Sequence, residues 1–255
     1  MKFLDTIKTI NRVLGATGYH LTYGAVASPS VTREFFQTVA NTIVDFRPAK
    51  PLALSTAWVE DLFHDIEAQS VPYRMGRYTQ SELPISECLT ITALVRHLKP
   101  LAAFEIGTYL GRTTRLIAEH APTDAVVYTL DLPFESKQAR TDWQGQIEQV
   151  DEARHHQSLG PNIVRLFGNS RTFDFSPYYG RMDLVYVDGD HSYEGVASDT
   201  VQAMHMVKPG GLVIWDDYHA AWPGVVRCLE ETATTHELQH LAMTRLACYR
   251  APVPR

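Results

Sequence analysis

The chain has 255 residues, 45% of them hydrophobic and 20% charged, which is enough for one large globular domain or one domain with a substantial extension. The formal net charge is −6 and no basic stripe runs along the sequence, so a nucleic-acid partner is disfavoured. The three cysteines lie far apart and form no CxxC pair, which indicates neither a zinc site nor a disulfide framework and fits a cytoplasmic protein. No apolar run approaches the roughly 20 residues that a membrane span requires.

The first 82 residues show helical spacing and no strong strand signal. Apolar residues at helical intervals predict helices over residues 32–46 and 55–68, and the prolines and glycine of residues 71–84 predict a loop. We therefore expect a helical N-terminal extension over residues 1–82. Because no other task is evident for it, we expect this extension to close over a bound substrate as a lid and to form the interface of a homo-oligomer.

The rest of the chain, residues 83–255, is expected to form one α/β domain. A helix is predicted over residues 85–98, and from residue 101 onward short apolar runs alternate with helical stretches. Strands are predicted at 102–106, 126–130, 163–167, 184–187 and 212–215, helices at 113–120, 137–156 and 194–207, and a terminal antiparallel hairpin at 239–242 and 247–250. Repeated βα units predict a Rossmann-like, doubly wound, mostly parallel sheet with helices on both faces, in which ligands bind at the carboxyl ends of the strands.

The segment after the first predicted strand has the pattern E-x-G-x-x-x-G-x-T. Its first glycine allows a sharp turn and a close approach to a ligand, and the following helix offers free backbone N–H donors. The spacing differs from the G-x-G-x-x-G of dinucleotide binders, whose pyrophosphate needs a tighter approach. It suits a zwitterionic amino-acid tail, with contacts expected from Glu105, Gly107, Thr108, Gly111 and Thr113.

Polar residues also follow the next three predicted strands. Asp131 ends the second strand, where a carboxylate can accept hydrogen bonds from both hydroxyls of a ribose. Asn169 and Ser170 follow the third strand, where short amide and hydroxyl side chains can contact an adenine edge, and Asp188 ends the fourth. Each residue alone is also typical of a turn or a helix cap, but their joint placement at successive strand ends indicates a nucleoside-binding site.

On these motifs, the segment from about residue 78 to residue 218 resembles the class I S-adenosylmethionine-dependent methyltransferases. Residues 104–114 resemble the first motif of that family, Asp131 its acidic ribose-binding position, and residues 208–211 (K-P-G-G) the turn before its fifth strand. More narrowly, V-D-G-D-H-S-Y-E-G at 187–195 and I-W-D-D-Y at 214–218 resemble the subfamily that contains macrocin and novobiocin-sugar O-methyltransferases and cephalosporin-hydroxylase-like proteins. The resemblance implies S-adenosyl-L-methionine as the cofactor.

Two pairs of aspartates are expected at adjacent strand ends: Asp188 with Asp190, and Asp216 with Asp217. Their mutual repulsion requires that one of them is protonated or that a cation neutralises them. Oxygen ligands of this kind suit Mg²⁺ and, less selectively, Mn²⁺ or Ca²⁺. The resemblance to the subfamily implies Asp188, Asp216 and Asp217 as the metal ligands. The alternative is that these aspartates only cap turns and order the cofactor loop.

Two residues beside these carboxylates are candidate catalytic bases. The resemblance favours Asp190, whereas the intrinsic pKa of an imidazole favours His191. The third alternative is that neither residue is essential. In each case the base would take the proton of an acceptor hydroxyl that attacks the methyl group in line.

The sequence therefore predicts a metal-assisted O-methyltransferase acting on a hydroxyl of a small molecule, in particular a sugar of a glycosylated natural product or glycan. Three alternatives stay open. The first is a metal-independent enzyme with His191 as base, and the second is an enzyme for a catechol-type acceptor. The third is a protein that binds S-adenosylmethionine, or a cephalosporin-hydroxylase-like component, without methyl transfer.

Overall fold

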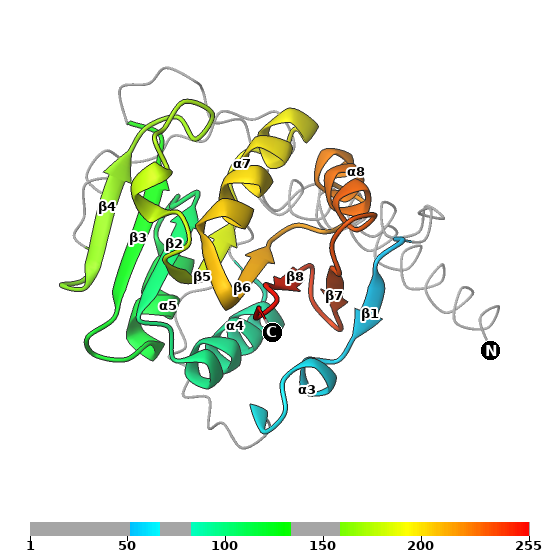
Figure 1. Ribbon diagram of the computed structural model, residues 1–255, viewed down its shortest axis with the longest axis horizontal. Coiled ribbons are helices and arrows are strands. Elements are labelled where there is room, and N and C mark those ends of the chain that lie inside the picture. Colours follow the sequence, from blue (N-terminus) through cyan, green and yellow to red (C-terminus); the bar gives the residue numbers. More distant parts are fainter. Residues whose placement is uncertain (1–51, 67–82, 134–158, 255) are drawn as a thin grey trace, which may run out of the picture. The chain divides into compact units, whose positions relative to one another are not determined.

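The computed structural model describes residues 52–66, 83–133 and 159–254. The chain divides into two compact units, Met1–Leu52 and Ala53–Arg255, and every described helix and strand belongs to the second. The described residues of this unit form one eight-stranded sheet in the order β1-β7-β8-β6-β5-β2-β3-β4 (Figure 1). The strands are β1 Ser55–Ala57, β2 Ala102–Ile106, β3 Val126–Asp131, β4 Ile163–Phe167, β5 Met182–Val187, β6 Val207–Trp215, β7 Gln239–Leu241 and β8 Ala247–Arg250.

The central strands β4, β3, β2, β5 and β6 run parallel to one another. The chain moves outward from β2 through β3 to β4 and then returns to the other side of β2 to form β5 and β6. This reversal between β2 and β5 is the topological switch point at which open α/β sheets bind ligands. Beyond β6 the sheet is mixed, because β8 runs antiparallel to β6, β7 antiparallel to β8, and β1 parallel to β7.

Helices cover both faces of the sheet. On one face, α4 (Ile85–Leu98) and α5 (Arg112–His120) share a core cluster with alternate strand residues such as Leu184 and Ile214. On the other face, α7 (Tyr193–Met206) packs against β5 and β6, and the indole N–H of Trp215 donates to Thr200 Oγ1 at 3.0 Å. α8 (Pro223–Thr232) packs against α7. Two short helices, α3 (Val59–Leu62) and the 3₁₀ helix η3 (Ser176–Tyr178), complete the described elements.

These layers confirm the predicted doubly wound, mostly parallel α/β fold. The strands predicted at 102–106 and 163–167 and the helix predicted at 85–98 have the bounds expected from the sequence. The C-terminal hairpin is confirmed as β7 and β8. Helix α8 is not among the predicted elements. Its Pro-Gly start is typical of a turn, but proline is also favoured in the first turn of a helix, as here.

The helix predicted over residues 55–68 is wrong. The structure has strand β1 at its start, followed by the single-turn helix α3. Ser55 Oγ donates to Gln239 Oε1 at 2.9 Å, and the backbone of β1 pairs with β7 in parallel. Asp65 then adopts φ +67°, which a continuing helix does not allow. Pairing with a distant strand therefore overrides the helical spacing of the apolar residues, of which Phe63 and Ile66 are still buried.

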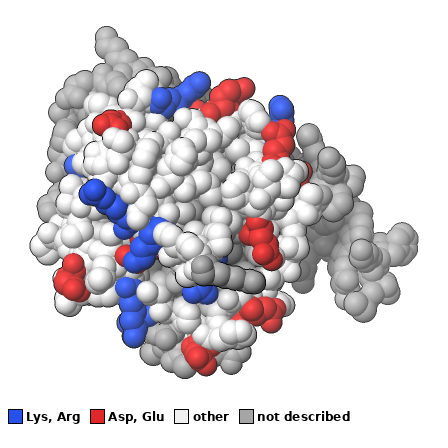
Figure 2. Space-filling view, viewed as in Figure 1, with Lys and Arg blue, Asp and Glu red and all other residues white. Residues whose placement is uncertain are grey.

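The helices predicted at 32–46 and 137–156 lie outside the described residues, as does most of the loop predicted at 71–84. Within the described ranges, none of the helices has the length and apolar character that a membrane span needs. On the face drawn in Figure 2, basic and acidic side chains are both present and scattered over the described surface.

Candidate active site

The turn after β2 brings the backbones of neighbouring strand ends into contact. Gly107 follows β2 with φ +97°, a conformation that residues with a side chain rarely adopt. Its N–H donates to Leu130 O at 2.9 Å, and the N–H of Asp188 donates to Ile106 O at 2.8 Å. A Cβ atom on Gly107 would lie 1.9 Å from the carbonyl oxygen of Asp188, so no larger residue fits. The glycine turn therefore lies at the switch point between β2 and β5.

The second glycine of this turn begins helix α5. Gly111 is the N-cap residue with φ +70°, and its N–H donates to Thr108 O at 2.7 Å. The hydroxyl oxygens of Thr108 and Thr129 lie 2.6 Å apart, and both Thr108 and Thr113 are buried. The N-terminus of α5 is thus held at the carboxyl end of β2, where its free N–H groups can bind a ligand carboxylate.

Glu105, in β2, is a buried acid that accepts hydrogen bonds on only one of its two carboxylate oxygens among the described residues. The residue is 1% exposed, and its Oε2 accepts hydrogen bonds from the hydroxyls of Thr114 and Thr129. Its Oε1 is buried and has no hydrogen-bond partner among the described residues. Burial raises the pKa of Glu105 to about 8, against the opposing effect of the two threonine hydroxyls. A cationic ligand group beside Oε1 would offset this cost of burial.

The residues predicted to bind the nucleoside follow β3, β4 and β5. Asp131 is the last residue of β3, and its Oδ1 accepts from the N–H of Leu132 at 2.9 Å. Asn169 follows β4, and its Oδ1 accepts from the N–H of Arg171 at 3.0 Å, so this side chain stabilises its own turn. Ser170 is next in the chain and interacts with buried Asp199 of α7. The structure therefore brings the predicted cofactor residues to one edge of the sheet.

Three titratable side chains meet where β5 and β6 end. Asp188, His191 and Asp217 each offer one ligand atom, and these atoms all lie within 4.8 Å of one another. His191 Nε2 lies 2.9 Å from Asp217 Oδ2 and 3.8 Å from Asp188 Oδ1. Trp222 stacks on the His191 ring, with centroids 4.1 Å apart and planes 18° apart. We call Asp188, His191 and Asp217 the acidic cluster.

Asp216 does not belong to the acidic cluster. It accepts a hydrogen bond on Oδ2 from the hydroxyl of Tyr186 at 2.8 Å, and on Oδ1 from the N–H of Asp217 at 2.6 Å. Burial and the neighbouring carboxylates Asp188, Asp217 and Glu87 raise the pKa of Asp216 well above its ordinary value. Asp217 itself adopts φ +60°, and the consecutive side chains of Asp216 and Asp217 contact different partners. Of the three predicted metal ligands, two therefore lie together and the third lies apart.

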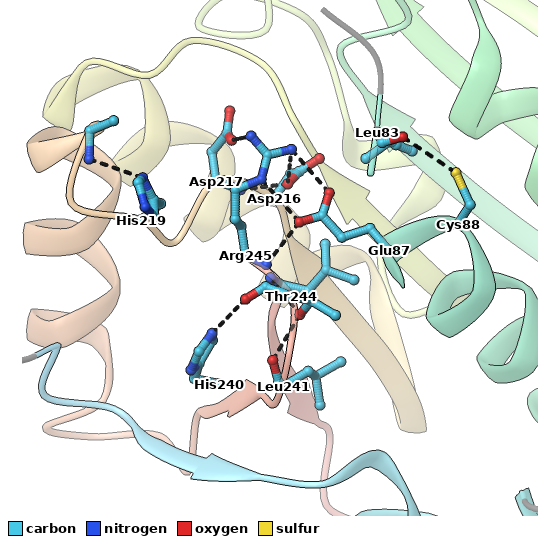
Figure 3. Close-up of polar contacts among 12 residues, drawn as sticks. Leu83, Glu87, Cys88, Asp216, Asp217, His219, His240, Leu241, Thr244 and Arg245 are labelled. Carbon is cyan, nitrogen blue, oxygen red and sulfur yellow. Dashed lines mark hydrogen bonds and ion pairs between the residues drawn. The ribbon is translucent and has the colours of Figure 1, made fainter. Parts of the chain in front are cut away.

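Two residues that the sequence analysis does not single out complete the surroundings of Asp217. Arg245, from the turn between β7 and β8, lies with its Nη1 2.9 Å from Asp217 Oδ1. Glu87 of α4 accepts from Arg245 Nε and Nη2, each at 3.0 Å (Figure 3). The only sequence signal for this pair is an acidic residue within a predicted helix, because its partner lies 158 positions away.

The ion pairs determine the charges of the acidic cluster. Burial alone would lower the pKa of His191, but Asp188 and Asp217 outweigh it and raise the pKa to about 10. Burial alone would raise the pKa of Asp217, but His191 and Arg245 hold it below its ordinary value. At neutral pH, His191 and Asp217 are therefore an imidazolium and a carboxylate. The repulsion expected among the carboxylates is relieved partly by two neighbouring cations, His191 and Arg245, which both lie 2.9 Å from Asp217.

Asp190, the other candidate base, serves the start of α7. Its Oδ1 accepts from the N–H of Ser192 at 2.9 Å and its Oδ2 from the hydroxyl of Ser192 at 2.8 Å. Ser192 in turn is the N-cap residue of α7 and accepts from the N–H of Gly195 at 3.1 Å. Of the two candidate bases, the structure thus brings His191 into the acidic cluster and directs Asp190 to the helix cap.

Comparison with known proteins bears on the family of the domain and on its fold. Residues 104–218 match the family model described as a methyltransferase domain. Among solved structures, the cofactor-bound protein Rv0187 from MTB is similar with a TM-score of 0.51 at 18% identity, over 69% of this chain and 84% of that one. A protein from Corynebacterium glutamicum is similar with a TM-score of 0.51 at 13% identity, over 68% and 84%. No curated protein matches the sequence.

The matched segment runs from β2 through the Gly107 turn to the end of β6, so it contains both the switch point and the acidic cluster. The two structural similarities extend the agreement in fold beyond this segment. The predicted enzyme class is confirmed to the extent of the match: residues 104–218 form a methyltransferase domain, and the sheet has the Rossmann-like fold predicted for it.

Proposed function

We propose that the protein transfers the methyl group of S-adenosyl-L-methionine to a hydroxyl of a small molecule. The observation that carries this proposal is the acidic cluster, which lies beside the Gly107 turn through the backbone of Asp188. Methyl transfer from a sulfonium is an in-line displacement, so the enzyme must hold an oxygen nucleophile and remove its proton. An imidazole paired with carboxylates at the switch point suits both tasks.

The residues present fit the cofactor. Gly107 and Gly111, which have no side chains, bracket the turn that leads into the N-terminus of α5, where free N–H groups can bind a carboxylate. The buried Oε1 of Glu105 is available to the ammonium group of the methionine tail. We assign Asp131 to the ribose and the segment of Asn169 and Ser170 to the adenine. The other proposed cofactor residues at the same edge of the sheet are Thr108, Gly111, Thr113 and Asp188.

A divalent cation also fits. The carboxylates of Asp188 and Asp217, whose ligand atoms lie within 4.8 Å of each other, are oxygen donors that suit Mg²⁺ or Mn²⁺. We propose Asp188 and Asp217 as its ligands and leave out Asp216, because both of its oxygens already accept hydrogen bonds, from the hydroxyl of Tyr186 and the N–H of Asp217. When bound, such an ion makes an acceptor hydroxyl more acidic and can align two adjacent oxygens.

Among the chain's own residues, His191 is the proposed base. Asp217 holds its ring at Nε2 and Trp222 holds the ring plane. His191 must lose its own proton first, and a ligand that engages Asp217 weakens the ion pair that retains this proton. Asp190 is the alternative base, and it can act only if its hydrogen bonds with Ser192 open.

For the acceptor we propose a hydroxyl of a sugar or polyol, as in a glycosylated natural product or glycan. The support is the resemblance of residues 187–195 and 214–218 to sugar O-methyltransferases. We further propose that residues 1–82 provide a lid and a homo-oligomer interface. Deletion of residues 1–51, which leaves strand β1 and the buried Phe63 and Ile66 in place, is then expected to abolish activity or assembly, and a variant that keeps both would reject this role.

Single-turnover transfer of a labelled methyl group to a panel of glycosides and catechols, with and without EDTA, tests the proposal. Transfer to glycosides that EDTA abolishes supports it, and transfer only to catechols changes the acceptor class. Transfer that resists EDTA favours the second candidate, a metal-independent enzyme with His191 as base. That candidate is supported by Arg245, a cation of the chain itself whose Nη1 lies 2.9 Å from Asp217 Oδ1. Cofactor binding without transfer to any acceptor would leave a non-catalytic binding protein.

A further inference from the structure

A buried ion pair links helix α4 to the end of β6. Glu87 is 1% exposed and receives three hydrogen bonds from Arg245. The backbone N–H of Arg245 donates to Oε1 at 2.8 Å, Nε donates to the same oxygen at 3.0 Å, and Nη2 donates to Oε2 at 3.0 Å. A two-pronged guanidinium–carboxylate contact of this kind fixes the guanidinium in both position and orientation.

Arg245 in turn holds the segment that carries Asp217. Its carbonyl oxygen accepts from the N–H of Tyr218 at 2.8 Å, and its Nη1 lies 2.9 Å from Asp217 Oδ1. Nη2 lies 4.0 Å from Asp216 Oδ1. In Figure 3 the guanidinium lies between Asp217 and Glu87, with Asp216 close beside it. The second oxygen of Asp217 is left to face His191 Nε2.

We propose that Glu87 and Arg245 are positioning residues that hold Asp217 with one oxygen toward His191, and so determine the geometry of the acidic cluster. This inference rests on the proposed function, in which Asp217 is both the partner of the base and a cation ligand. Neither Glu87 nor Arg245 needs to touch the substrate. They act through the carboxylate of Asp217, across three elements that are distant in the sequence.

The charges explain why both members of the pair are needed. Arg245 alone would place an uncompensated positive charge beside the cluster and repel a divalent cation. Glu87 cancels that charge while it keeps the guanidinium directed at Asp217. Loss of the Glu87 charge is therefore expected to weaken cation binding both by repulsion and by misplacement of Asp217. Partners that orient a metal ligand in this way contribute about 10- to 100-fold to metal affinity.

The test compares Glu87→Gln with the wild-type protein and with Glu231→Gln. Glu231 forms an exposed pair with Arg227 at 2.9 Å on α8, so it is a matched control for a lost Arg–Glu contact. Three quantities are measured: the ring N–H signal of His191 in the NMR spectrum, the affinity for Mn²⁺, and the affinity for S-adenosylhomocysteine. The NMR signal is assigned by its loss in His191→Gln.

We expect Glu87→Gln to lose the protected His191 N–H signal and to bind Mn²⁺ about 10- to 100-fold more weakly, with unchanged S-adenosylhomocysteine affinity. Glu231→Gln should resemble the wild type. Arg245→Lys, which keeps the charge but not the two-pronged contact, replaces Glu87→Gln if that variant does not fold. An unchanged signal in the folded variant, or no protected signal in the wild type, overturns the inference.

Two outcomes separate this inference from the proposed function. A wild-type protein that binds no Mn²⁺ contradicts the metal in the proposed function, while loss of the NMR signal in Glu87→Gln still supports the positioning role. A wild-type protein that does not bind S-adenosylhomocysteine contradicts the proposed cofactor site, and the positioning role is again decided by the NMR signal.

Discussion

The two halves of the candidate active site are built in different ways. The part of the cofactor half proposed for the methionine tail comes from one continuous segment, in which β2, the Gly107 turn and the start of α5 follow one another within residues 102–114. The acidic cluster and its supports come from α4, the ends of β5 and β6, and the turn before β8. The first half therefore depends on local backbone geometry, whereas the second depends on side-chain contacts between distant elements. Substitutions in the two halves should therefore differ in whether they impair stability and cofactor affinity or the rate of transfer.

Gly107→Ala should have the largest effect, because it disturbs the backbone conformation on which the cofactor half depends. The added Cβ would lie 1.9 Å from Asp188 O at a residue with φ +97°, so we expect a loss of about 3 kcal/mol or more in the free energy of unfolding. Thermal unfolding and S-adenosylhomocysteine titration measure the effect. Gly180→Ala is the control, because Gly180 also has a positive φ but open space around its Cβ position, and it should cost only about 1–2 kcal/mol. Equal effects of the two would contradict the crowded contact.

His191→Gln should come next, and it should leave the cofactor half intact. We expect the single-turnover rate to fall about 10²- to 10⁴-fold, as for loss of a general base, with S-adenosylhomocysteine affinity unchanged. Asp190→Asn serves as the comparison, because Asp190 caps the turn before α7, and we expect it to change the rate less than His191→Gln does. The opposite order of effects would transfer the role of base to Asp190.

Glu105 predicts a pH dependence that belongs to the cofactor half alone. Burial raises the pKa of Glu105 from 4.5 to about 8, so the free protein holds this proton at pH 6 to 7. If the ligand ammonium requires the carboxylate, binding releases a proton and S-adenosylhomocysteine affinity rises with pH, by at most about tenfold per pH unit below pH 8. Calorimetric titration in buffers of different ionisation enthalpy measures the proton release. Glu105→Gln should abolish it, and a pH-independent wild-type affinity would remove Glu105 from the ammonium site.

The raised pKa of Glu105 also predicts how the stability of the folded protein depends on pH. Because the pKa of this acid is raised in the folded state, the folded free protein binds more protons than the unfolded chain between pH 4.5 and 8. The contribution of Glu105 to stability therefore falls as pH rises through this interval. Bound S-adenosylhomocysteine should reduce the fall.

Trp222→Leu should have the smallest effect and should change only the properties of the acidic cluster. The stacking of Trp222 on His191 is expected to contribute about 0.5–1.5 kcal/mol, which corresponds to a two- to tenfold loss of rate. Rate and cofactor affinity are measured in parallel. A large loss of cofactor affinity would show that the two halves are more strongly coupled than their separate construction indicates.

The same contrast explains what could be predicted from the sequence. The glycine turn and the strand ends are local patterns, so β2 and β4 and the polar residues that follow the strands could be located without coordinates. That Asp216 lies outside the acidic cluster could not be predicted, because its position depends on Tyr186 and on the backbone conformation of Asp217. The positioning of Asp217 by Arg245 was equally inaccessible, since no spacing rule links residues 87, 217 and 245. Strand β1 was misassigned for the same reason, because its pairing partner β7 lies far along the chain.

A crystal structure with bound S-adenosylhomocysteine and Mn²⁺ tests the central claim most directly, because it shows whether the two halves meet at one reaction centre. We predict the ligand's ammonium beside Glu105 and an anomalous manganese peak between Asp188 and Asp217. We also predict space for one acceptor oxygen beside His191, about 3–3.5 Å from the position of the transferred methyl carbon. A cofactor whose sulfur points away from the acidic cluster, or manganese bound elsewhere, would contradict the account.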